Sequence, residues 1–226
     1  MSKNRLRIIT NIMMVLGVAL IAIPAIFWLN ATYYQWNETK QWQSLIKSEK
    51  LPESQSRTLS TGVKGQTADT TESVQAQAAD LVDRGPIKPG ENVALLSIPK
   101  INLKLSVIEG ESWTNLATGP VRVSKTARIG DRGTTLVSGH RTMFGAPFHD
   151  LHKIAINDEL ILYTKKAAFS YEVSDIKRVN PDDWRDITEG GNSQLILSTC
   201  DPIYSAAKRL LIISKMRSVQ PLGTVK

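Results

Sequence analysis

The sequence predicts an all-β domain, folded as a closed or nearly closed β-barrel, that follows one membrane-spanning helix and a flexible linker. Three observations support this prediction. An uncharged apolar segment near the N-terminus is long enough to cross a bilayer, and a polar segment without aromatic residues comes after it. The remainder of the chain consists of short strand-like runs that are separated by turn residues.

The apolar segment, residues 8–29, contains no charged side chain, and as a helix it would extend roughly 33 Å, enough to cross a bilayer core. Residues 1–7 carry a basic cluster of Lys3, Arg5 and Arg7, and no comparable cluster directly follows the segment. The positive-inside rule therefore predicts a single-pass protein of the cell membrane, with a cytoplasmic N-terminus and an extracellular remainder. A cleaved signal peptide is the alternative, but its apolar region is usually shorter and ends in small residues.

The charge of the chain does not indicate a nucleic-acid partner. The formal net charge is +7, of which three charges belong to the N-terminal cluster, and the other basic residues are scattered. A mildly basic extracellular domain would meet an anionic envelope surface, or its charges would serve solubility alone. We therefore expect a membrane protein that binds no nucleic acid.

Residues 30–88 are predicted to form a juxtamembrane segment and a polar linker. A short amphipathic helix is expected over residues 37–50, at the membrane surface. Residues 51–83 are rich in Ser, Thr, Gln, Gly and Ala, and this composition buries too little apolar surface to offset the entropy lost on ordering. We expect residues 51–83 to be a flexible tether.

The folded domain is expected over residues 89–219, followed by a short tail at residues 220–226. Val, Ile, Leu, Tyr and Thr dominate its strand-like runs, and Gly, Pro, Asn and Asp separate them. The predicted strands lie at residues 93–98, 103–110, 134–140, 159–164, 169–179, 194–200 and 209–216. Short, closely spaced strands without a long helical period favour a barrel.

Three residues at predicted strand ends have the chemistry for acyl transfer. Cys200, the only cysteine, ends one strand, His140 ends another in a glycine-containing loop, and Arg209 begins the last. A thiolate is a nucleophile, a histidine protonates a leaving amine, and a guanidinium holds an oxyanion. The alternative for the unpaired extracellular cysteine is a small buried side chain without reactivity. The alternative for the histidine and the arginine is a purely structural role.

Metal sites are the other chemistry that the residue types allow. Zinc would use His140, His149 and His152, but a suitable fourth ligand is missing. Calcium would use an acidic turn, although such turns are common without a metal. The acidic residues of that turn are Asp182, Asp183, Asp186 and Glu189. We expect neither a metal nor a cofactor.

Four segments carry motifs of a known family. Residues 195–214, LILSTCDPIYSAAKRLLIIS, and residues 139–154, GHRTMFGAPFHDLHKI, surround the candidate cysteine and histidine. They resemble the T-L-x-T-C motif with its trailing arginine and the histidine segment of sortases, the transpeptidases of Gram-positive surfaces. Residues 93–110 and 115–121 are similar to the I-P-x-I opening strands and the L-x-x-G-P turn of that family. The resemblance is strongest to class E, the housekeeping type of many actinobacteria.

The resemblance implies a closed sortase-type β-barrel of about eight strands with short helices. It also implies roles at the site: Cys200 as the nucleophile, His140 as the general acid, and Arg209 as the arginine that holds the oxyanion or positions the substrate. The residues that it implies for substrate binding are Thr199, Arg141 and Phe144.

The resemblance further implies the reaction and its partners. Sortases of this kind cut a C-terminal sorting signal of L-P-x-T-G or L-A-x-T-G type between Thr and Gly and hold the acyl group as a thioester. An amino group of a peptidoglycan precursor then accepts the surface protein. Class C pilin polymerases are disfavoured, because the sequence lacks their usual C-terminal membrane segment.

Two other functions remain open. One is a different extracellular Cys/His enzyme, such as an L,D-transpeptidase or a papain-like peptidoglycan hydrolase. The first usually has a histidine-glycine-cysteine cluster, and the second has its cysteine before its histidine, whereas here His140 precedes Cys200. The other function is a membrane-anchored β-barrel that binds a partner and has no catalytic activity, which would require a buried and unreactive Cys200.

Overall fold

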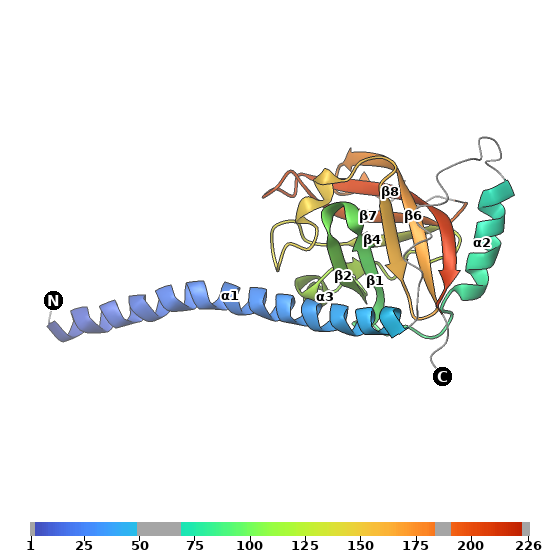
Figure 1. The fold of residues 1–226 in the computed structure, drawn as a ribbon. Coiled ribbons are helices and arrows are strands. Elements are labelled where there is room, and N and C mark those ends of the chain that lie inside the picture. The colour runs from blue at the N-terminus through green and yellow to red at the C-terminus, as the bar shows by residue number, and fades with distance from the viewer. Residues whose placement is uncertain (1–2, 49–68, 184–190, 223–226) are drawn as a thin grey trace.

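The computed structural model describes residues 3–48, 69–183 and 191–222. A long N-terminal helix leads to a closed β-barrel, and the C-terminal half of the helix lies along the side of that barrel (Figure 1). The N-terminal half of the helix extends away from the barrel as a rod (Figure 1).

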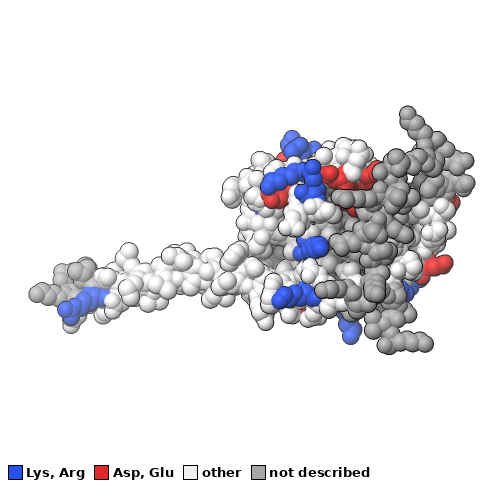
Figure 2. All heavy atoms as spheres, viewed as in Figure 1, with Lys and Arg blue, Asp and Glu red and all other residues white. Residues whose placement is uncertain are grey.

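Helix α1 (Lys3–Ser48) is one continuous helix with Pro24 inside it. It is long and apolar enough to cross a membrane, and its large hydrophobic side chains are exposed from Ile8 to Leu29. Apart from blue side chains near its N-terminal end, the rod is drawn without charged residues up to the barrel (Figure 2). Exposed apolar side chains over this length are favourable only in an apolar solvent, so α1 fits a membrane anchor.

The short helix expected over residues 37–50 is not a separate element. Residues up to Ser48 continue α1, and the side chain of Gln35 attaches this part of the helix to the barrel. Gln35 Nε2 donates to the carbonyl oxygens of Ser106 and Thr118, both at 3.3 Å, and Gln35 Oε1 accepts from the Ser106 amide at 3.0 Å. A Cβ atom at Gly119 would lie 1.9 Å from Gln35 Nε2, so the close approach requires glycine there.

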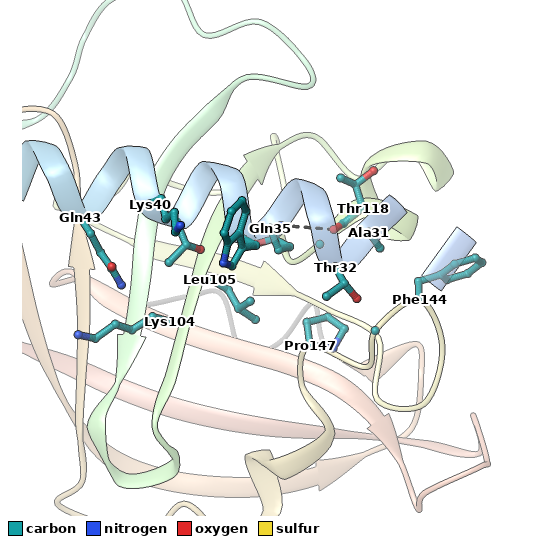
Figure 3. Close-up of a pocket in the computed structure, with 14 residues that line it drawn as sticks. Ala31, Thr32, Gln35, Lys40, Gln43, Lys104, Leu105, Thr118, Phe144 and Pro147 are labelled. Atoms are coloured by element: carbon teal, nitrogen blue, oxygen red, sulfur yellow. Dashed lines mark hydrogen bonds between the residues drawn. The ribbon is translucent and has the colours of Figure 1, made fainter. Parts of the chain in front are cut away.

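A groove of about 400 Å³ lies between α1 and the barrel beside this contact. Figure 3 shows the groove running from Gln43 and Lys104 at one end to Pro147 and Phe144 at the other. Phe144 belongs to the loop that follows the fourth barrel strand, so the groove ends near the candidate histidine.

In the described residues, eight strands close the barrel in the order β1-β2-β3-β4-β7-β8-β6-β5. Strand β2 is parallel to β3, β4 is parallel to β7, and the other pairs are antiparallel. The strands are β1 (Asn92–Ile98), β2 (Leu103–Glu109), β3 (Val121–Arg122), β4 (Thr134–Ser138), β5 (Glu159–Tyr163), β6 (Ala167–Val179), β7 (Gln194–Asp201) and β8 (Lys208–Pro221). The predicted all-β barrel is confirmed.

Short helices connect the strands. They are the 3₁₀ helix η2 (Pro99–Ile101), helix α3 (Trp113–Thr118) and the 3₁₀ helix η3 (His149–Lys153). Ser112 caps α3, because its hydroxyl accepts a hydrogen bond from the Asn115 amide at 3.2 Å. The sequence did not predict β3, which has two residues and is therefore too short to show a period.

Helix α2 (Asp69–Leu81) overturns part of the predicted tether. Residues 69–81 pack beside β8 as a helix, and Ala78 is fully buried in the main core. Gln75, 2% exposed, donates through Nε2 to the Gly130 carbonyl at 3.2 Å and accepts at Oε1 from the Ser193 amide at 2.9 Å. The expectation was wrong for residues 69–81. This helix has few apolar residues, and hydrogen bonds between a glutamine and the backbone attach it to the barrel; the hydrophobicity of the sequence does not reveal such bonds. Residues 51–68 of the predicted tether lie outside the described residues.

Alternation along the strands sorts side chains to the two faces of the barrel wall. Leu195 and Leu197 of β7 point into the barrel and join the main core. Ile196, between them, points outward into a second, smaller cluster. This outer cluster consists of Leu136, Ile196, Leu211 and Ile213, from β4, β7 and β8. Each of these three strands therefore presents alternate residues to one outer surface.

Candidate active site

The three residues with acyl-transfer chemistry lie side by side across neighbouring strands. In the parallel pair β4 and β7, Ser138 lies opposite Ser198. His140 and Cys200 each follow two residues after this point, at the same end of the barrel. In the antiparallel pair β7 and β8, Arg209 lies directly opposite Cys200. Because side chains alternate along strands, Cys200 and Arg209 belong to the face of the outer cluster. His140 lies in the loop that continues from β4 beside β7, where the Gly139 amide donates to the Ser198 carbonyl.

Cys200 is a free, half-buried cysteine that contacts the candidate arginine directly. Nη1 of Arg209 donates a hydrogen bond to Sγ of Cys200 at 3.3 Å. A guanidinium at this distance from a nucleophilic sulfur is also close to the carbonyl oxygen of a group that the sulfur attacks. It can therefore stabilise the negative charge that develops on that oxygen.

His140 has a buried ring nitrogen without a partner in the described part of the chain. Within the described residues, its Nε2 has no hydrogen-bond partner, and its ring lies against that of Phe144, with ring centroids 5.2 Å apart. Burial lowers the pKa of His140. Leaving a buried polar group unpaired costs about 1–3 kcal/mol, which a bound molecule would recover by hydrogen bonding to Nε2.

The loop of His140 is fixed against β7 by glycine and backbone contacts. Gly139 donates from its amide to the Ser198 carbonyl at 3.1 Å, and its own carbonyl accepts from Thr199 Oγ1 at 2.8 Å. A Cβ atom at Gly139 would lie 2.8 Å from the ring of Phe148. The Phe148 amide in turn donates to the His140 carbonyl at 2.9 Å. These contacts set the position of the histidine relative to the cysteine.

A buried ion pair between Arg141 and Asp201 contacts the backbone of Cys200. Nη1 of Arg141 donates to the Cys200 carbonyl at 3.0 Å and to the Asp201 carboxylate. Nε of Arg178 donates to the other oxygen of Asp201 at 3.0 Å. Burial raises the pKa of Asp201, but the hydrogen bonds and charges of both arginines outweigh it and leave that pKa below its usual value. Asp201 therefore stays ionised and keeps the pair intact.

Two of the residues expected to bind substrate lie beneath the site. Thr199 and Arg141 are 2% and 4% exposed, and their hydrogen bonds hold the end of β7 and the loop of His140. Phe144 is partly exposed beside His140 and remains the candidate for substrate contact. Sequence reasoning gave no role to Asp201 and did not single out Arg178. The available signal was that Arg141 and Asp201 directly follow the candidate histidine and cysteine.

The described residues contain no group of three or more His, Cys, Asp or Glu side chains placed to hold a metal ion. His149 Nδ1 lies 2.9 Å from a carboxylate oxygen of Asp150, and His152 Nδ1 lies 3.1 Å from the His149 carbonyl. Two of the acidic residues considered for calcium, Asp186 and Glu189, lie outside the described residues.

Comparison with known proteins identifies the family. The family model described as "Sortase domain" matches residues 96–217, more than half of the chain. This chain belongs to the sortase family. Sortase D of Bacillus subtilis (strain 168) is 31% identical over 156 residues, which cover 67% of this chain and 77% of that relative. Sortase A of Bacillus anthracis is 26% identical over 121 residues, which cover 53% of this chain and 57% of that relative.

Solved sortase structures share the barrel. Sortase E from Streptomyces avermitilis is 29% identical, with a TM-score of 0.55 over 59% of this chain and 93% of that structure. The sortase resemblance and the sortase-type barrel are therefore confirmed. The comparisons support a sortase enzyme of the transpeptidase type, and the N-terminal apolar helix fits the membrane anchor of such an enzyme. This sortase spans 57% of the length of the B. anthracis relative.

Proposed function

We propose that this sortase cleaves a C-terminal L-P-x-T-G or L-A-x-T-G signal between Thr and Gly and transfers the surface protein to an amine of a peptidoglycan precursor. The observation that carries the proposal is the row of His140, Cys200 and Arg209 at one end of a sortase barrel, with the Arg209 guanidinium 3.3 Å from the sulfur. This row combines a nucleophile, a proton carrier and an oxyanion donor at adjacent strand ends.

In the first half-reaction, the Cys200 thiolate attacks the carbonyl carbon of the signal's threonine. The new C–S bond pushes the carbonyl electrons onto oxygen, where the Arg209 guanidinium donates to the oxyanion. The intermediate then collapses, the C–N bond breaks, and protonated His140 gives its proton to the departing glycine amine. Because burial lowers the pKa of His140, its protonated form is a stronger acid than an exposed imidazolium.

In the second half-reaction, an amine of the acceptor attacks the thioester carbonyl. Neutral His140 takes the proton that the amine loses, and Arg209 again donates to the oxyanion. Collapse of this intermediate forms the new amide and releases the Cys200 thiolate, which returns the enzyme to its starting state. Arg141 and Thr199 act as positioning residues, because they bond to the backbone around Cys200 and His140.

The proposed location is the cell membrane, with α1 as a single anchor. The basic residues before the apolar segment would keep the N-terminus in the cytoplasm, so the barrel would lie outside the cell. There it would meet surface proteins that carry the sorting signal and the peptidoglycan precursor that accepts them.

The test uses the full chain in nanodiscs with L-P-x-T-G and L-A-x-T-G peptides and an oligoglycine amine, followed by mass spectrometry. We expect cleavage after Thr, an acyl-enzyme at Cys200, and a ligated peptide. Cys200→Ala should abolish all three while the barrel melts at a similar temperature, because the substitution removes one small, half-buried group. Transfer by Cys200→Ala would eliminate the proposed nucleophile, and no cleavage by the wild type would favour a binding module.

A further inference from the structure

Three aromatic rings join the membrane helix to the catalytic end of the barrel. Phe27 of α1 contacts Trp113 of α3 and Phe144 of the His140 loop, with centroid separations of 6.4 Å and 6.2 Å. Trp113 and Phe144 also pack edge to face, at 5.4 Å. The cluster is nevertheless open to its surroundings, because Phe27 is 44% and Trp113 61% exposed.

The position of Phe27 sets the depth of this cluster relative to the membrane. Phe27 belongs to the uncharged apolar segment of α1, two residues before its end at Leu29, a rise of about 3 Å along a helix. Side chains that touch the Phe27 ring must therefore lie at the boundary between lipid and water. Tryptophan and other amphipathic rings are enriched at this boundary.

Other exposed apolar side chains gather at the same end of the barrel. Met143, next to Phe144 in the His140 loop, is 54% exposed. Tyr204, 88% exposed, lies in the turn between β7 and β8 that follows Cys200. This turn points to the side of the barrel from which the N-terminal half of α1 extends (Figure 1). The described part of the barrel exposes one other large hydrophobic side chain, Ile156, which precedes β5.

We propose that the catalytic end of the barrel rests on the outer leaflet of the membrane through Trp113, Met143 and Phe144, which Phe27 holds at that depth. The proposal rests on the membrane anchor of the proposed function and adds a second, peripheral membrane contact to it. The partner is a lipid bilayer rather than a protein, because the patch continues directly from the segment of α1 that spans the membrane. The loop of His140 then borders the lipid surface. A peptide that is itself held in the membrane would therefore lie at the same distance from the bilayer as the site.

The test measures depth in full-length protein in nanodiscs of phosphatidylglycerol and phosphatidylcholine. Spin labels are placed one at a time, in a Cys200→Ala background, at Met143→Cys, Leu20→Cys and Lys165→Cys. Lys165 is the matched exposed control in the turn between β5 and β6, at the opposite end of the barrel from Arg209. Collision rates with oxygen and with a water-soluble nickel chelate report whether each label lies in lipid or water.

We expect the ratio of oxygen to chelate collisions at Met143→Cys to lie between the high ratio at Leu20→Cys and the low ratio at Lys165→Cys. Lipid-like access at Leu20 with water-like access at Met143 would overturn this proposal alone. Water-like access at Leu20 would overturn the anchor and this proposal with it. Protection of Met143 from both reagents would indicate a second protein copy on this face and would also overturn the lipid contact.

A second measurement needs no cysteine variant. Brominated lipids quench tryptophan fluorescence, and Trp113→Phe should remove part of the quenched signal, whereas Trp42→Phe, at a buried position on α1, should not. Equal losses in the two variants would contradict a lipid contact at Trp113. Neither measurement depends on catalytic activity, so a failed sorting reaction would leave both results interpretable.

Discussion

At the scale of single residues, the site depends on one arginine contact and on one histidine nitrogen that has no partner among the residues that the structure describes. The register between β7 and β8 places Arg209 beside the sulfur of Cys200, and the loop after β4 holds His140 with its ring nitrogen Nε2 buried. Each contact has a measurable consequence, because each changes a charge or a proton that the proposed reaction uses.

Arg209→Ala is expected to lower turnover by roughly 100- to 1000-fold, or about 3–4 kcal/mol in the barrier, because it removes an oxyanion donor. Arg209→Lys should also be poor, since it keeps the charge but loses the planar fork of donors. The measurement is turnover on one sorting-signal peptide, with Lys208→Ala as the control at the exposed neighbour on β8. Near-normal turnover in a folded Arg209 variant would leave only Cys200 and His140 as catalytic residues.

The half-buried ring of His140 should make stability depend on pH in a defined direction. Burial lowers its pKa in the folded state, so the unfolded chain, with a pKa of about 6.5, binds the proton first as the pH falls. This contribution to stability is present above the unfolded pKa and is lost as the pH falls through the folded pKa. Between about pH 7.5 and about pH 5, the wild type should therefore lose more stability than His140→Gln.

The measurement for His140 is the melting temperature of each full-length protein in detergent micelles at both pH values. His152→Gln, an exposed histidine of η3, controls for the loss of a histidine as such. A wild type and a His140→Gln variant that respond equally to pH would show that burial of this ring does not contribute.

At the scale of elements, two helices are attached to the barrel by buried glutamines. Gln35 attaches α1 to β2 and to the end of α3, and Gln75 attaches α2 to the loops before β4 and β7. In both cases the amide donates from nitrogen and accepts at oxygen, so one side chain satisfies several backbone groups. Such contacts give a helix a fixed position with little apolar area.

Gln75→Ala is expected to destabilise the barrel by about 1–3 kcal/mol, because it leaves the buried Gly130 carbonyl and Ser193 amide without the partner that Gln75 provides. Gln77→Ala, at an exposed position of the same helix, should change stability by less than about 0.5 kcal/mol. The measurement is equilibrium unfolding of the full-length variants in urea. An equal effect of both substitutions would show that α2 is not docked through Gln75.

At the scale of the whole molecule, α1 joins the membrane and the barrel into one unit. Its N-terminal half is exposed and apolar, whereas its C-terminal half is packed on the barrel around Gln35. Because the helix is continuous through both halves, the orientation of the barrel relative to the membrane follows from this contact.

Gly119→Ala tests that arrangement. The new methyl group would take the place of the Gln35 amide, and the displaced side chain would lose its bonds to Ser106 and Thr118, about 1–3 kcal/mol. We expect faster amide hydrogen exchange over residues 30–48 in nanodiscs, because an undocked helix opens more often. Gln35→Ala should behave alike, and Gly17→Ala, where the added Cβ meets nothing within 4 Å, should not. Unchanged exchange in Gly119→Ala would show that Gln35 does not hold α1 in place.

The sequence by itself determined the apolar anchor, the strands from β1 to β8 apart from β3, and the family motifs around His140, Cys200 and Arg209. These follow from local chemistry, because hydrophobicity, strand period and turn residues are read within a few positions. Only the tertiary structure decided which strand ends meet. The crossed order β4-β7-β8 brings together residues sixty positions apart and sets Arg209 opposite Cys200. The tertiary structure alone also showed the docking of α2, the buried Arg141–Asp201 pair and the contact of Phe27 with the loop of His140. These features rest on hydrogen bonds and packing between distant segments, which no local pattern encodes.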